Sequence, residues 1–252
     1  MIVLAIDSSA DQVSVAVLRD RAPLAARAYT SARPRSETVL GVVEGVLADA
    51  EVALDLVDLF AVASGPGSFN GIRGGIATAE GLAFALDRPV VGIPTLDAIA
   101  YAHIGRAPIL LAVLPTGRGD YYAASYEGDA ERWRRRDEYV VGPLAEALDG
   151  LPAGALVCGS VSPGEEPLLE RTGLRRAPLF AELPRALSLG ALATAQAAEG
   201  RVDRAAPVRP LYLRRPGITQ PTRPAAVALR AARVEVERTP EPVLPARFGG
   251  GA

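Results

Sequence analysis

The sequence predicts an α/β protein, because short apolar segments alternate with amphipathic ones along the first part of the chain. Three strand-like segments come first, followed by a helix, a strand, a second helix and another strand, which is the order of a layered α/β sheet. The chain has 252 residues, 49% of them hydrophobic, so it can bury a core as one large domain or two small ones. No apolar run approaches the roughly 20 residues that cross a bilayer, and no basic leader is seen, so we expect a cytoplasmic protein without membrane contact.

The first part of the chain has clear start and stop signals. The polar turn Asp7–Asp11 lies between two apolar runs and predicts a β-hairpin. Ser36 and Glu37 are typical of a helix start, and Pro89 ends the second helix. The expected strands are 2–6, 13–18, 22–29, 59–63 and 90–93, and the expected helices are 36–50 and 70–86.

The later part predicts a second, smaller α/β lobe, joined to the first by a helix at 96–102. Its expected strands are 109–114, 121–126, an edge strand at 133–141, and 155–159, and its expected helices are 144–148 and 187–199. We therefore expect an N-terminal lobe at 1–104, a C-terminal lobe at 105–214 and a Pro/Arg-rich tail at 215–252. The recurring prolines and the missing periodicity of the tail indicate a flexible segment.

Composition excludes several chemistries. All 27 cationic residues are Arg, which removes Schiff-base chemistry, and the net charge of −2 does not indicate nucleic-acid binding. One His and one Cys cannot form a His/Cys metal site, so we expect no metal. Carboxylate-only Mg²⁺ binding through Asp7, Asp11 and Asp120 stays open. We expect Cys158 to be a buried structural thiol and His103 to be a helix-end or surface residue.

A glycine-rich turn leads from a strand into a helix between Ser64 and Leu86 and has the shape of a phosphate cradle. The chain has no Lys to complete a phosphate loop, and the glycine spacing does not match the dinucleotide fingerprint. We therefore favour a structural interpretation. Gly65 and Gly67 provide backbone freedom, and Ser68 caps the helix because no base is found for it as a nucleophile. The remaining glycines, Gly71, Gly74, Gly75 and Gly81, let a second helix approach closely.

Five segments together resemble one protein family. They are Ile2–Ser9 (IVLAIDSS), Gly65–Arg73 (GPGSFNGIR), Gly75–Ala83 (GIATAEGLA), Arg118–Tyr122 (RGDYY) and Tyr212–Arg214 (YLR). They occur in order over residues 1–214, and the loop with its helix is the most specific of them. In these segments the chain resembles the TsaB (YeaZ) family.

The resemblance implies a two-lobed actin-like/sugar-kinase-type (ASKHA) fold. TsaB proteins are noncatalytic subunits of the bacterial machinery that places N6-threonylcarbamoyl on adenosine 37 of tRNAs reading ANN codons. The transferase is the paralogue TsaD, the ATPase TsaE joins the pair, and TsaB forms a homodimer when TsaD is absent. The resemblance thus implies no catalytic residue and no cofactor of its own, with tRNA reached through the complex. A nucleotide at the partner interface stays open.

Four positions depart from the family pattern. Asn70 replaces the usual Thr, Glu80 a common Lys or Gln, and Pro115 an Asp. Arg35 replaces a frequent His, which makes metal-dependent transfer by this chain still less expected. These changes leave partner affinity and the details of the loop open.

Four residues are weak candidates for a cofactor site: Asp7, Ser9, Gly67 and Arg118. In kinase-like members of the fold, the turn with Asp7 and Ser9 faces a phosphate or its metal, although such a turn more often satisfies its own N–H groups. The second candidate function is therefore a nucleotide-dependent kinase or ATPase of this fold, and a homodimeric scaffold unrelated to tRNA ranks third. Arg118 and the arginines at 132 and 134–136 are either tRNA or partner contacts or ordinary exposed residues.

The two N-terminal helices are apolar over more of their circumference than contact with one sheet requires. In the family, the corresponding helices form a bundle with those of TsaD or of a second TsaB. We therefore expect a partner interface that includes Val39, Leu40, Val43, Val46, Leu47, Ile72, Ile76, Ala79, Leu82 and Ala83.

Overall fold

The structure, a computed structural model, describes residues 1–30, 36–129, 132–178, 184–204 and 206–213. The tail expected at 215–252 and the departure at Arg35 lie outside these residues. Within the described part of the chain, no helix is both long enough and apolar enough to span a membrane.

The first sheet has five strands in the order β3-β2-β1-β4-β5. Its strands are β1 (Ile2–Asp7), β2 (Gln12–Arg19), β3 (Ala22–Thr30), β4 (Leu59–Gly65) and β5 (Val90–Pro94). The first three form an antiparallel meander, while β4 pairs in parallel with β1 and β5 in parallel with β4. The expected hairpin and all five expected strands of this part of the chain are confirmed.

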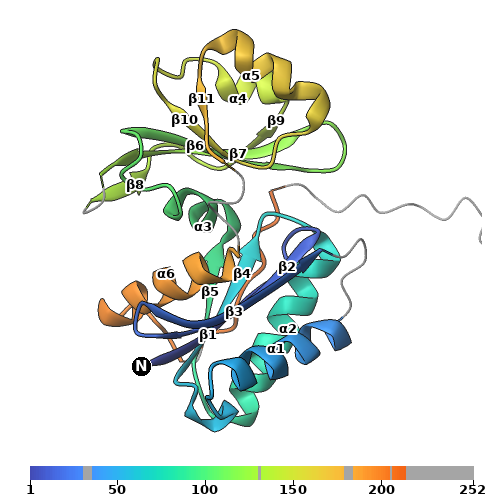
Figure 1. Cartoon of the computed structure of the whole chain (residues 1–252), viewed down its shortest axis with the longest axis vertical. Helices are drawn as coiled ribbons and strands as arrows, with labels where there is room; N and C mark the ends of the chain where they lie inside the picture. Colours follow the sequence, from blue (N-terminus) through green and yellow to red (C-terminus); the bar gives the residue numbers. More distant parts are fainter. Residues whose placement is uncertain (31–35, 130–131, 179–183, 205, 214–252) are drawn as a thin grey trace, which may run out of the picture. The chain divides into compact units, whose positions relative to one another are not determined.

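Side chains of the first sheet alternate between two helical layers, as the twofold period of strands requires. Leu4 and Ile6 point to the side of α1 (Ser36–Asp49) and α2 (Phe69–Ala85). Val3 and Ala5 point to the side of α6 (Ala186–Ala198). Figure 1 shows α1 and α2 on one face of the sheet and α6 on the other. A short 3-10 helix, η1 (Leu54–Leu56), follows α1.

The second sheet has the order β11-β10-β6-β7-β8, with β9 also paired to β7. Its strands are β6 (Ile109–Pro115), β7 (Tyr121–Gly128), β8 (Trp133–Arg135), β9 (Val140–Gly142), β10 (Leu156–Gly159) and β11 (Arg175–Arg176). Its helices are α3 (Thr95–Tyr101), α4 (Leu144–Leu148), η2 (Pro163–Glu165) and α5 (Glu166–Thr172). One face packs on α3 and the other on α4 and α5. Cys158 is buried as expected, and its thiol faces the Leu111 carbonyl oxygen at 3.4 Å.

One sequence expectation about the second part is wrong. The single edge strand at 133–141 is two strands, β8 and β9, that pair with different parts of β7. Between them the Asp137 carboxylate accepts a hydrogen bond from the Ser125 hydroxyl, so a side chain takes over where the ladder is interrupted. His103 follows the end of α3, which confirms the helix-end alternative, and it is fully buried.

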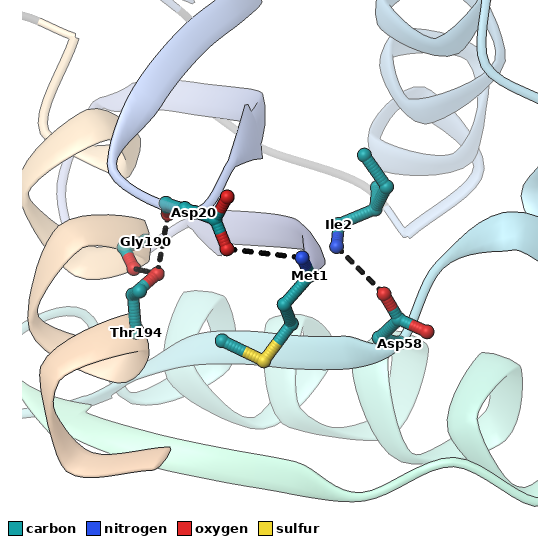
Figure 2. Close-up of polar contacts among 6 residues, drawn as sticks. All are labelled: Met1, Ile2, Asp20, Asp58, Gly190 and Thr194. Atoms are coloured by element: carbon teal, nitrogen blue, oxygen red, sulfur yellow. Dashed lines mark hydrogen bonds and ion pairs between the residues drawn. The ribbon is translucent and has the colours of Figure 1, made fainter. Parts of the chain in front are cut away.

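Helix α6 was expected inside the C-terminal lobe at 105–214, and it packs instead on the first sheet. Gly190 allows this approach, because a Cβ there would lie 2.3 Å from Leu18 Cδ1. Thr194 Oγ1 donates to the carbonyl oxygens of Asp20 and Gly190, at 2.6 and 2.8 Å (Figure 2). The Met1 amine binds the Asp20 carboxylate at 3.0 Å. The helix, the turn between β2 and β3 and the start of β1 are therefore joined.

Helix α3 is linked to the second sheet by a half-buried carboxylate. Asp97 Oδ1 accepts hydrogen bonds from the hydroxyls of Tyr126 and Tyr139, at 2.7 and 2.8 Å. The Arg135 guanidinium lies 3.9 Å from the centre of the Tyr139 ring. Burial raises the pKa of the Asp97 carboxyl above its usual range, and the two hydroxyls and Arg135 oppose this shift only in part.

We predict that Asp97 makes the protein less stable as pH rises. The folded chain holds the Asp97 proton more tightly than the unfolded chain, so stability is lost from the unfolded pKa of about 3.9 up through the raised pKa of Asp97. Asp97→Asn keeps an acceptor oxygen but removes this titration. Urea unfolding of both proteins at several pH values should show the stability of the wild type, relative to the variant, declining across this window. Parallel pH profiles would contradict the prediction.

Candidate functional site at the carboxyl edge of the first sheet

The glycine-rich turn lies where β1 and β4 end side by side. Its backbone is bound to the turn after β1, because the Ser68 amide donates to the Ser9 carbonyl at 2.7 Å. The Ser8 hydroxyl donates to the Gly71 carbonyl at 2.8 Å. The Leu211 amide donates to the Ser64 carbonyl at 2.7 Å, so a late segment of the chain closes the turn from another side.

Three glycines of this turn and of α2 are required by close contact with Ser8 and Ser9. A Cβ on Gly67 would lie 2.2 Å from the Ser9 carbonyl oxygen, and a Cβ on Gly71 would lie 2.0 Å from that of Ser8. A Cβ on Gly75 would lie 2.3 Å from Ser8 Oγ. The structural interpretation is thus confirmed for these positions, but the close neighbour is the first hairpin turn and not a second helix.

The other two glycines of α2, Gly74 and Gly81, have nothing within 4 Å of such a Cβ. Ser68 behaves as expected: its Oγ accepts a hydrogen bond from the Gly71 amide at 3.3 Å and caps α2. The hydroxyl is therefore used by the fold.

Asp7 is enclosed by partners on both carboxylate oxygens. Oδ1 accepts from the amide and the hydroxyl of Ser9, at 2.9 and 2.6 Å. Oδ2 forms an ion pair with Nε of Arg185 at 2.6 Å. Both side chains are buried, with 1% exposure for Asp7 and 3% for Arg185. The carboxylate that a kinase of this fold would turn toward a phosphate or metal is here part of the core.

Arg185 is the residue of this site that sequence reasoning missed. It directly precedes α6 and lies 178 positions from Asp7, so no local pattern connects the two. The next residue strengthens the junction, because the Ala186 amide donates to Ser14 Oγ on β2 at 3.1 Å.

The structure brings three of the four weak cofactor candidates together and leaves the fourth elsewhere. Asp7, Ser9 and Gly67 meet at the edge of the first sheet. Arg118 lies in the exposed turn between β6 and β7 of the second sheet, where its amide donates to Thr116 Oγ1 at 3.3 Å. No group of three or more His, Cys, Asp or Glu among the described residues is placed to hold a metal ion.

Several arginines around β8 have partners within the chain. Arg134 and Arg136 form ion pairs with Glu127, at 2.5 and 3.4 Å. Arg135 packs on the Tyr139 ring. These contacts are those of an edge strand whose charges are largely neutralised by its neighbours.

Most residues expected at a partner interface lie in the core of the first lobe. Val39, Val43, Val46, Leu47, Ile72, Ile76, Ala79 and Ala83 are at most 7% exposed and belong to one apolar cluster with the sheet. Leu40 is 42% exposed and Leu82 is half-buried. The free apolar surface of α1 and α2 is therefore carried chiefly by Leu40, which belongs to the expected set, and by Phe84, which does not and is 89% exposed.

The two sheets with their helical layers define the protein as a member of the actin-like/sugar-kinase-type (ASKHA) fold class. The crystal structure of the ROK hexokinase from Thermus thermophilus covers 79% of this chain and 100% of its own, with a TM-score of 0.51. At 14% identity this likeness shows the fold alone.

More similar proteins indicate the family within this fold class. A family model described as TsaD, tRNA N6-adenosine threonylcarbamoyltransferase, matches residues 29–157, which is half of the chain. An uncharacterized protein of Mycobacterium tuberculosis is 35% identical over 85% of this chain and 92% of its own. The Escherichia coli tRNA threonylcarbamoyladenosine biosynthesis protein TsaB is 29% identical over 85% and 95%. A Pseudomonas aeruginosa crystal structure, described as similar to peptidase YeaZ, gives a TM-score of 0.71 at 28% identity over 84% and 99%.

The chain therefore belongs to the TsaD family and, within it, to the TsaB (YeaZ) proteins.

We predict opposite effects for two alanine substitutions in α2. Gly71→Ala forces a methyl group against the Ser8 carbonyl and should destabilise the fold by about 1–3 kcal/mol. Gly74→Ala meets open space and should stabilise it by about 0.5–1 kcal/mol, because alanine is the better helix former. Urea unfolding measures both, and equal shifts in the midpoint would contradict the assigned packing.

The buried ion pair predicts a large, non-additive loss of stability. Arg185→Met leaves the Asp7 carboxylate buried without its cation and should cost about 3–5 kcal/mol. Asp7→Asn combined with Arg185→Met should cost less than the sum of the single changes, because no uncompensated charge remains. Arg134→Met, which removes a largely exposed ion pair, is the control and should cost about 0–1 kcal/mol. If the loss of stability in the double variant equals the sum of the two single losses, Asp7 and Arg185 act independently and the prediction is wrong.

Proposed function

We propose that this chain is the noncatalytic TsaB subunit of the machinery that installs the N6-threonylcarbamoyl group on adenosine 37 of tRNAs reading ANN codons. The observation that carries this proposal is similarity along nearly the whole length of the E. coli threonylcarbamoyladenosine biosynthesis protein. In this proposal TsaD is the direct partner and TsaE joins the pair, while tRNA is modified through the complex in the cytoplasm.

The noncatalytic role is supported by the contacts that already occupy the polar side chains of the candidate site. The Asp7 carboxylate is occupied by Ser9 and Arg185, and the Ser68 hydroxyl caps α2. Neither group is available for a phosphate, a metal or an acyl group without breaking contacts of the fold. For this reason we do not favour the nucleotide-dependent kinase or ATPase. Calorimetry with ATP and Mg²⁺ on the isolated protein separates the two, since submillimolar binding with turnover would favour the enzyme.

We propose that TsaD docks on the exposed surface of α1 and α2, and that a second copy takes its place when TsaD is absent. Leu40 and Phe84 expose large apolar side chains there. Gly41, Gly74 and Gly81 have open space around them, so another helix can come close to these backbones. Val43 and Ile76 are buried, and a charge at either position would damage the core before it tested the interface. A nucleotide held between the partners remains compatible with this surface.

The proposed function is tested by depleting this protein in its host and measuring threonylcarbamoyladenosine in tRNA. We expect the modified base to fall, wild-type protein to restore it, and Leu40→Glu with Phe84→Glu to fail, because two buried carboxylates would oppose an apolar interface. The purified double variant should remain folded and lose copurification with TsaD.

Val140→Glu is the matched control, since Val140 is 49% exposed on β9 of the second sheet. It introduces the same charge on another surface and should restore the modification. Unchanged modified-base levels on depletion would reject the assignment. Normal association of the double variant with TsaD would reject only the proposed surface.

A further inference from the structure

An aromatic pair lies exposed at the start of α2, outside the contacts used above. The rings of Phe69 and Tyr212 are 5.2 Å apart with 34° between their planes. The Arg73 guanidinium carbon lies 5.1 Å from the centre of the Phe69 ring. Phe69 is 36% exposed and Tyr212 is 42% exposed. We call Phe69, Arg73 and Tyr212 the aromatic platform.

The platform is held in place from both sides. Phe69 is the first residue of α2 and follows its cap, Ser68. The segment that carries Tyr212 is bound by the Leu211 amide to Ser64 and by the Val208 amide to Glu80 Oε1, at 2.7 and 2.9 Å. Glu80, a departure from the family pattern, thus has a structural role. Two large apolar rings are kept partly in solvent by backbone hydrogen bonds, which is a preorganised arrangement.

The platform carries one cation, Arg73, and the sequence after it is rich in arginine. Arg73 is exposed, and no carboxylate among the described residues forms an ion pair with it. The sequence that follows the platform, 214–252, contains seven Arg and three Glu, a net charge of +4. The preceding 213 residues contain 20 Arg against 26 Asp and Glu. In the sequence, the excess of cations is therefore found from Arg214 onward.

We propose that the aromatic platform stacks an unpaired base of single-stranded RNA, with Arg73 at the adjoining phosphate. Exposed aromatic rings flanked by arginine are the common means of binding unstacked bases, since every base offers a π-face. An acidic peptide would use the arginines but not the rings. This inference rests on the proposed function and adds a direct contact to the tRNA, whose unpaired loops supply such bases.

The experiment measures binding of the full-length protein to a hairpin RNA whose loop carries a fluorescent adenine analogue. Tyr212→Leu keeps an apolar side chain but removes stacking and should weaken binding about tenfold or more, while Tyr212→Phe should bind as the wild type does. Leu56→Ala removes an exposed apolar side chain elsewhere, on η1, where Leu56 is 58% exposed, and should have no effect. Arg73→Gln should lower the salt dependence of binding, with the slope of log K against log salt falling by about 0.7.

Fluorescence of the adenine analogue should change on binding to the wild type and to Tyr212→Phe only. Equal RNA affinity and equal fluorescence for Tyr212→Leu and the wild type would overturn the inference, as would an equal loss of binding with Leu56→Ala. The proposed function has a separate readout, because it depends on the modified base in depleted cells. If Tyr212→Leu restores the modification fully and binds RNA normally, the platform proposal fails and the function stands.

Discussion

The ion pair between Asp7 and Arg185 is the contact on which the arrangement of this chain depends. It joins the end of the central strand β1 to the start of α6, across 178 positions of sequence. Burying either charge alone is costly, so the folded state has to bring them together. The chain therefore forms the second sheet and then returns to the first sheet with α6. Hydrogen bonds from Ala186 to Ser14 and from Thr194 to Asp20 then hold α6 against the first sheet. Gly190 lets the backbone of the helix come close to Leu18.

The same pair bears on what the edge of the first sheet can do. In an open α/β sheet, the carboxyl ends of the strands are where ligands usually bind. Here that edge is filled by contacts within the chain: Ser9 and Arg185 bind Asp7, Ser68 binds Ser9, and Leu211 binds Ser64. The polar groups of Asp7, Ser9 and Ser68 at this edge are thus used for the stability of the fold.

Local patterns predicted the elements of this fold well, because apolar periodicity and capping residues act over a few positions. The expected strands and helices of the first sheet, the cap at Ser68 and the burial of Cys158 are confirmed. Long-range partners left no such signal. The position of α6, the partner of Asp7 and the division of the strand at 133–141 depend on contacts between distant segments. Most residues of the expected interface set face the sheet for a related reason, since apolar periodicity marks the buried side of a helix without saying which neighbour buries it.

The glycines of the glycine-rich turn and of α2 have two different roles. In the turn before α2 and on the inner side of the helix, Gly67, Gly71 and Gly75 leave no room for a Cβ, because Ser8 and Ser9 lie against them. On the outer side, Gly74 and Gly81 have free space and no neighbour in this chain that would require a glycine. A helix interior made of glycine costs stability relative to alanine, and contacts among the described residues do not offset this cost at Gly74 and Gly81. The outer glycines lie on the helix that exposes Phe84, and a partner helix resting there would use the space that the fold leaves empty.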